Sequence, residues 1–173
     1  MIITVATFSL DQARKYLGRR YHHGHSHALD QRRAWVGFDT DDNDQSPLRY
    51  TPDCGERGLV IRCHDWDEDG RHAPAFVGPA QCAGAPTIEH ARAIVRFVLA
   101  QHARPERIDL CVHCHAGLFR SGAVAEWARS DLGVEEHAES NRLVGVLGER
   151  DDSRTYNNAL LRLIREAHAE ATR

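Results

Sequence analysis

Residues 108–122 read IDLCVHCHAGLFRSG, and they join an apolar run, a loop with one glycine and the start of a small-residue segment. The apolar run 108–112 predicts a buried strand, and 121–132 predicts a helix whose small residues suit close packing on a sheet. Cys114 then follows the carboxyl end of a strand and shortly precedes the amino end of a helix, which begins near Arg120 or Ser121. Open α/β sheets bind their ligands at that edge.

Strand and helix signals alternate along the rest of the chain. Ser9 and Gln12 form a capping-box pattern before a short helix that we expect to end at Gly18, and Thr87 caps a strong amphipathic helix. Strands are predicted over 2–8, 34–38 and 58–63, and helices over 10–17, 88–101, 138–147 and 155–171, with loops over 39–57 and 70–86. This alternation predicts an α/β fold with a mostly parallel sheet of about four to five strands, flanked by helices.

Composition limits the class of protein. The 173 residues fit one domain, 1–173, and no linker or repeat is evident. A net charge of −3 gives no support to general nucleic-acid binding. Five cysteines, an odd number with uneven spacing, do not suit a secreted disulfide scaffold. No signal peptide or apolar span is evident, so we expect a cytoplasmic protein with reduced thiols and no membrane association.

The segment 111–115, CVHCH, fits four kinds of site. It matches the C-x-x-C-H pattern of c-type haem attachment, and Cys111 with Cys114 makes a C-x-x-C redox pair. Two cysteines beside two histidines suggest zinc. A lone Cys114 six positions before Arg120 describes a nucleophile facing a phosphate. The strand pattern makes Cys111 a core residue, which favours the fourth interpretation and leaves a protective disulfide to Cys114 open.

The loop after Cys114 has the composition of an anion cradle. A glycine-containing loop that enters a helix amino terminus points backbone N–H groups inward and adds the positive end of the helix dipole. The same field stabilises a thiolate. Arg120 can offer two parallel N–H donors to two phosphate oxygens, a geometry that lysine does not match.

Residues 113–121 resemble the signature of a known family. His113-Cys114-x-Ala116-Gly117-x-x-Arg120-Ser121 resembles the H-C-x-A-G-x-x-R-S signature of the cysteine-based protein tyrosine phosphatase superfamily. The layout is similar to that of small bacterial predicted tyrosine phosphatases near the dual-specificity branch, with an H-D turn and an N-x-x-L helix (157–160). The resemblance covers 58–165 well and implies a tyrosine-phosphatase-like three-layer fold and a single catalytic domain.

The resemblance also implies a role for each position. Cys114 would attack phosphorus and form a cysteinyl-phosphate, and Arg120 with the backbone of 115–120 would hold the equatorial oxygens. Ser121 would help the thiolate leave, and His113 would order the loop without contacting substrate. The residues implied to bind substrate are His115, Ala116, Gly117, Leu118, Phe119 and Ser121.

The family uses an aspartate on an upstream loop as general acid. The segment 64–70, HDWDEDG, supplies three candidates at a strand end. Asp65 matches the H-D turn and is our first choice, Asp67 is the alternative, and Asp69 comes third.

The prediction is a cysteine-dependent phosphatase that hydrolyses phosphate monoesters, with protein phosphotyrosine as the first-choice substrate. It needs no cofactor and no metal. The alternatives are an inactive phosphate- or phosphopeptide-binding module and a thiol enzyme acting on another oxyanion. The histidines of 22–27 are interpreted as an exposed polar loop. The physiological substrate and the oligomeric state stay open.

Overall fold

A computed structural model describes residues 1–21, 32–39, 54–64, 84–115, 117–137 and 157–173. The predicted helix over 138–147 and the histidines of 22–27 lie outside these ranges. Most of the expected loop over 70–86 lies outside them as well.

Five parallel strands form the central sheet, in the order β3-β2-β4-β1-β5. The strands are β1 (Ile2–Ser9), β2 (Arg33–Asp39), β3 (Gly58–Arg62), β4 (Ile108–Cys114) and β5 (Glu135–Glu136). The α/β class and the predicted strand number are confirmed. β5 was not predicted, because two exposed glutamates carry no strand signal.

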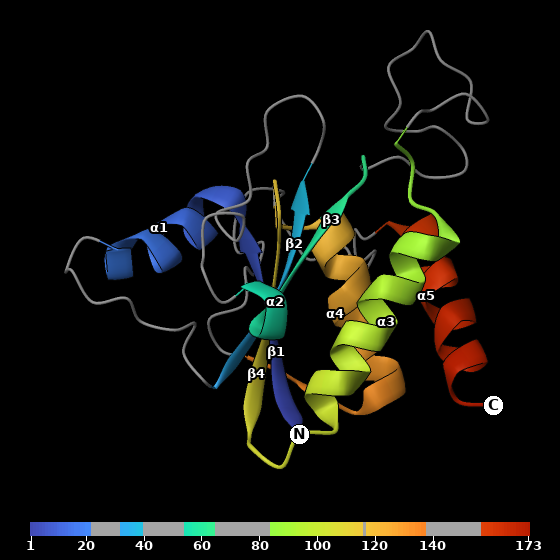
Figure 1. Cartoon of the computed structure of the whole chain (residues 1–173). Helices are drawn as coiled ribbons and strands as arrows, with labels where there is room; N and C mark the ends of the chain where they lie inside the picture. The colour runs from blue at the N-terminus through green and yellow to red at the C-terminus, as the bar shows by residue number, and fades with distance from the viewer. Residues whose placement is uncertain (22–31, 40–53, 65–83, 116, 138–156) are drawn as a thin grey trace, which may run out of the picture.

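Helices cover both faces of the sheet, and so the fold has three layers (Figure 1). One face carries α1, and the other carries α3, α4 and α5, with α5 packed on α3 and α4. The helices are α1 (Leu10–Tyr21), α2 (Cys54–Arg57), α3 (Ile88–His102), α4 (Phe119–Leu132) and α5 (Asn158–Ala171). The single turn α2 lies inside a stretch predicted to be loop.

Capping signals located the helix starts well and one helix end poorly. The Ser9 N–H donates to Gln12 Oε1 at 2.7 Å, and the Gln12 N–H donates to Ser9 Oγ at 3.2 Å, which confirms the capping box. Thr87 caps α3 as predicted. The expected end of α1 at Gly18 is wrong, because the helix continues to Tyr21. A glycine inside a helix costs only about 1 kcal/mol relative to alanine, and so it weakens the helix without ending it.

The two faces of the sheet carry separate apolar clusters. The larger cluster, which includes residues of α3, α4 and α5, takes alternate side chains of β4: Ile108, Leu110, Val112 and Cys114. The smaller cluster lies toward α1 and contains Cys111 with Ala6, Phe8, Ala13 and Trp35. Successive strand side chains point to opposite faces, so this division follows from the strand period of two.

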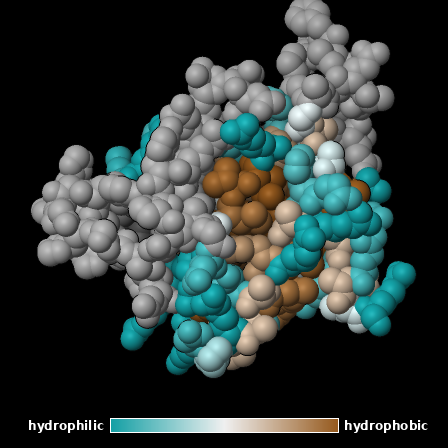
Figure 2. Space-filling view, viewed as in Figure 1, coloured by the Kyte–Doolittle hydropathy of each residue, from teal (hydrophilic) through white to brown (hydrophobic). Residues whose placement is uncertain are grey.

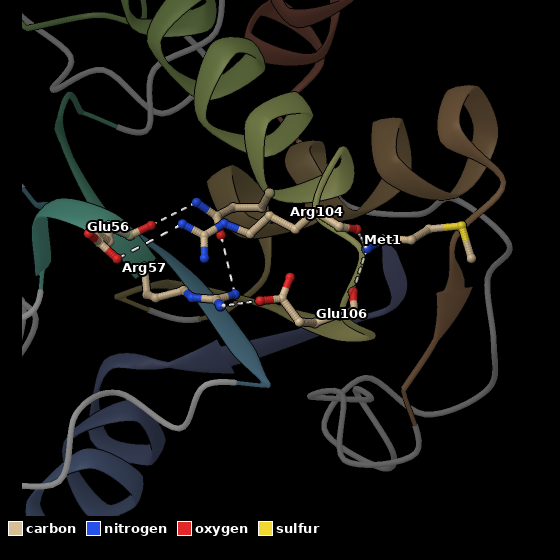
Figure 3. Close-up of polar contacts among 6 residues, drawn as sticks. Met1, Glu56, Arg57, Arg104 and Glu106 are labelled. Atoms are coloured by element: carbon tan, nitrogen blue, oxygen red, sulfur yellow. Dashed lines mark hydrogen bonds and ion pairs between the residues drawn. The ribbon is translucent and has the colours of Figure 1, made fainter.

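Polar contacts tie the first residue to the end of α3 and to α2 (Figure 3). The α-amino group of Met1 donates to the backbone oxygens of Arg104 and Glu106. Arg57, which is buried, lies 3.8 Å from Glu106 Oε1 and donates to Gln101 Oε1 at 3.5 Å. All of these contacts lie at the amino ends of the strands, the opposite edge from Cys114.

Polar and apolar residues are unevenly spread over the surface shown in Figure 2. Apolar residues gather in the middle of that face, with hydrophilic residues above, below and to the right of them. Within the described part of the chain, no helix combines the length and the apolar character needed to cross a membrane.

Candidate active site at the carboxyl end of β4

Cys114 is the last residue of β4, which runs two residues further than predicted. The extension has a long-range cause: His113 and Cys114 pair in register with Phe8 and Ser9 of β1. β4 lies at the centre of the sheet, between β2 and β1. The thiol therefore lies at the middle of the carboxyl edge, where it is 1% exposed.

Ser121 lies next to the thiol. Its Oγ is 3.2 Å from Cys114 Sγ, and both groups are buried. α4 begins at Phe119, two residues before the predicted start, so Ser121 belongs to its first turn. A hydroxyl at this distance can donate to a thiolate and stabilise its charge.

Gly117 lets the loop 114–121, here called the Cys114 loop, pack against the end of β1. Its φ is +76°, and a Cβ there would lie 2.5 Å from Ser9 N and 2.6 Å from Phe8 C. The Leu10 N–H also donates to the His115 oxygen at 3.0 Å. Only glycine fits both this backbone conformation and this close approach.

Gly117→Ala is therefore expected to lower the melting temperature markedly and to reduce any activity of the site more than tenfold. Left-handed backbone strain costs about 1–3 kcal/mol, and the contact with rigid backbone adds to it. Gly133→Ala is the matched control, because Gly133 has a φ of +67° but nothing within 4 Å of its added Cβ. Equal thermal shifts for the two variants, measured by calorimetry, would show that the packing against β1 does not matter.

Arg120 is 2% exposed and reaches across β2 to the end of β3. Its Nη1 donates to the Cys63 backbone oxygen at 2.6 Å, and its guanidinium lies over the Phe38 ring, 5.8 Å from the centroid. Its Nε is buried and has no hydrogen-bond partner among the residues that the structure describes. A buried N–H donor without an acceptor is costly, and an anion at this position would satisfy it.

The first turn of α4 supplies backbone N–H groups, and the side chain of its N-cap residue does not bind them. Its N-cap residue is Leu118, whose side chain offers no acceptor, and the Gly122 N–H donates to the Leu118 oxygen at 2.8 Å. The Asn157 N–H donates to the Phe119 oxygen at 3.1 Å, and Asn157 Oδ1 accepts from the Leu160 N–H at 2.9 Å. The N-x-x-L pattern is thus the N-cap of α5, and it ties α5 to the Cys114 loop.

His113 is fully buried and points to the other face of the sheet from Cys114, because the two are neighbours in a strand. Among the other substrate-binding candidates, His115 is exposed, and Leu118 and Phe119 are half-buried. Ala116, Asp65, Asp67 and Asp69 lie outside the described residues.

The segment that leads to Asp65 is nevertheless fixed at its base. The Cys63 N–H donates to the Asp39 oxygen at 3.1 Å, and the His64 N–H donates to the Gly84 oxygen at 2.6 Å. Cys63 also accepts the Arg120 contact through its carbonyl. The structure thus brings Arg120 to the residue two positions before Asp65.

Cys111 and Cys114 lie on opposite faces of the sheet, in different apolar clusters. Three strand residues span about 10 Å, and a disulfide requires Cα atoms within about 7 Å. The redox-pair and zinc hypotheses for CVHCH both need the two sulfurs together, and this geometry separates them. Across the described ranges, no three His, Cys, Asp or Glu side chains cluster as a metal site requires.

Phe38 and the Cys63 carbonyl, which both contact Arg120, could not be predicted from the sequence. Phe38 looks like any core residue of an apolar strand, and a backbone carbonyl has no sequence signal. Only the sheet order, which places β2 next to β4 and β3 next to β2, brings them to the site.

Comparison of the chain with protein-family models, with curated proteins and with solved structures finds no significant match. The chemistry of residues 113–121 is therefore the basis for assigning a function.

Proposed function

We propose that the chain is a cysteine-dependent phosphatase acting on phosphate monoesters, with protein phosphotyrosine as the first-choice substrate. The observation that carries the proposal is the buried Arg120 guanidinium at the start of the same helix that places Ser121 beside Cys114. Within the described part of the chain, Nε of this guanidinium has no hydrogen-bond partner. The three described cysteines, Cys63, Cys111 and Cys114, are buried and form no disulfide bond, which suits a reducing compartment such as the cytoplasm.

In the first step, the Cys114 thiolate attacks phosphorus and an S–P bond forms as the bond to the leaving oxygen breaks. Arg120 and the loop N–H groups hold the equatorial oxygens, where charge develops in the transition state. The leaving oxygen takes a proton from a general acid, and Asp65 is the first choice for that acid.

In the second step, a water molecule attacks phosphorus and the S–P bond breaks. The carboxylate that gave up its proton takes one from the water, and the electron pair returns to sulfur. Ser121 Oγ, 3.2 Å from Sγ, donates to the departing thiolate and so makes sulfur a better leaving group. Inorganic phosphate and the free enzyme are the products.

The loop favours a substrate with one phosphate group. Its variable positions are His115, Leu118 and Phe119, and it contains no lysine. Highly phosphorylated inositol lipids favour more positive charge around the site.

The direct test is hydrolysis of p-nitrophenyl phosphate by the purified wild-type chain between pH 5 and pH 8. The proposal expects turnover that vanadate inhibits and that chelators leave unchanged. No turnover across that range, with inorganic phosphate still bound, would identify a binding module instead. A protein that neither turns over phosphate esters nor binds phosphate would contradict the proposal as a whole.

Asp65→Asn is expected to slow the hydrolysis of aryl phosphates by about 100-fold or more when the leaving group is poor, and by much less when it is good. The physical reason is that a basic leaving oxygen needs a proton in the transition state, whereas a stable phenolate does not. The measurement is kcat for a series of aryl phosphates of increasing phenol pKa. Asp67→Asn is the matched control, and a steeper dependence in that variant would move the acid to Asp67.

A further inference from the structure

We infer that Phe38 is a positioning residue for Arg120, holding the guanidinium over its ring so that Nε can donate to the oxyanion. The inference deepens the proposed function and rests on it. Neither the apolar pattern of β2 nor the motif of the Cys114 loop predicts this role.

Phe38 lies beside the thiol. Gly37 pairs with His113 across β2 and β4, so Phe38 is one residue beyond that pair and level with Cys114. Adjacent strands lie about 4.8 Å apart. Phe38 and Cys114 also belong to the same apolar cluster and therefore share a face of the sheet. The fully buried Phe38 ring is thus part of the floor of the site.

The guanidinium is fixed at two points. Nη1 donates to the Cys63 oxygen at 2.6 Å, and the carbon of the guanidinium group lies 5.8 Å from the Phe38 ring centroid. The first contact sets the direction of the side chain, and the second places the guanidinium carbon over the face of the ring. Neither contact uses Nε, a buried donor for which the described ranges hold no hydrogen-bond partner.

An aromatic face is better suited than a carboxylate to compensate the charge of the buried Arg120 guanidinium. A buried cation is costly unless its charge is compensated, and within the described residues no carboxylate forms an ion pair with Arg120. The negative face of the ring compensates part of the charge without accepting any of the N–H groups. Arg120 therefore keeps both its net charge and its donors for phosphate.

The test compares the affinity for inorganic phosphate, measured by titration calorimetry, between wild type and variants at position 38. Phe38→Leu keeps the site apolar and removes the ring quadrupole, and we expect phosphate to bind about tenfold more weakly. Val36→Ala is the matched control, because Val36 is fully buried on the same strand and the same face. It is expected to lower stability without changing the affinity for phosphate.

Because a leucine in this floor can also disturb packing, fluorinated phenylalanines at position 38 provide the decisive series. Monofluoro, trifluoro and pentafluoro rings keep nearly the same shape and progressively weaken the negative face. We expect phosphate affinity to fall in that order at unchanged melting temperature.

Two outcomes would overturn the inference, and they are distinguishable. Equal phosphate affinity along the fluorinated series, with wild type binding normally, would remove the role of Phe38 and leave the proposed phosphatase intact. A wild-type protein that binds no phosphate would overturn the proposed function together with this inference.

Discussion

Replacing Cys114 by serine is expected to lower the rate of p-nitrophenyl phosphate hydrolysis at least about a thousand-fold, while inorganic phosphate still binds. A hydroxyl is a far weaker nucleophile than a thiolate, and the Ser121 hydroxyl, 3.2 Å from the sulfur, is not basic enough to activate it. The substitution changes one buried atom, so the fold and the anion donors of Arg120 and α4 should persist.

Cys111→Ser is the matched control for that experiment. Cys111 is as buried as Cys114 but belongs to the cluster on the other face of the sheet. Its serine variant is expected to lose about 1–3 kcal/mol of stability, because a hydroxyl enters an apolar cluster, and to keep its turnover. A Cys111→Ser protein that folds but is inactive would mean that the two thiols act together.

Arg120→Lys is expected to reduce kcat/KM by about 100- to 1,000-fold, the loss typical of removing a transition-state donor. Lysine keeps the charge but lacks the planar set of N–H donors. A guanidinium can donate to the Cys63 oxygen from one nitrogen and to an oxyanion from the others.

The control for Arg120→Lys lies on the same helix. Arg129 pairs with Glu126 and Glu136 near the other end of α4, at 3.8 and 3.9 Å. Arg129→Lys should leave kcat/KM and phosphate affinity unchanged. An Arg120→Lys enzyme within about threefold of wild type would contradict the bidentate role given to the guanidinium.

Sequence patterns predicted those parts of the site whose residues lie close together in the chain. The strand, the loop with Gly117 and the small-residue helix follow one another within 25 residues, 108–132. The apolar run, the glycine in the loop and the small residues of the helix were therefore enough to place Cys114 at the carboxyl edge of a sheet. The α/β class followed in the same way from the alternation of strand and helix signals.

Contacts between distant segments explain what sequence patterns did not predict. The last two residues of β4 are strand because β1 pairs with them, and β5 is strand because it pairs with Thr4 and Val5. Arg120 lies 57 positions from the carbonyl that holds it. Such contacts are specified by sheet order, and a single apolar strand carries no signal for its neighbours.

Trapping the covalent intermediate tests the central claim most directly. Wild-type protein is mixed with p-nitrophenyl phosphate, denatured within the first turnover and digested, and the peptides are analysed by mass spectrometry. We expect one phosphoryl group on the peptide that contains Cys114, and none when Cys114→Ser protein is treated in the same way. Turnover that proceeds with no phosphoryl group on Cys114, or with the group on another residue, would contradict the mechanism.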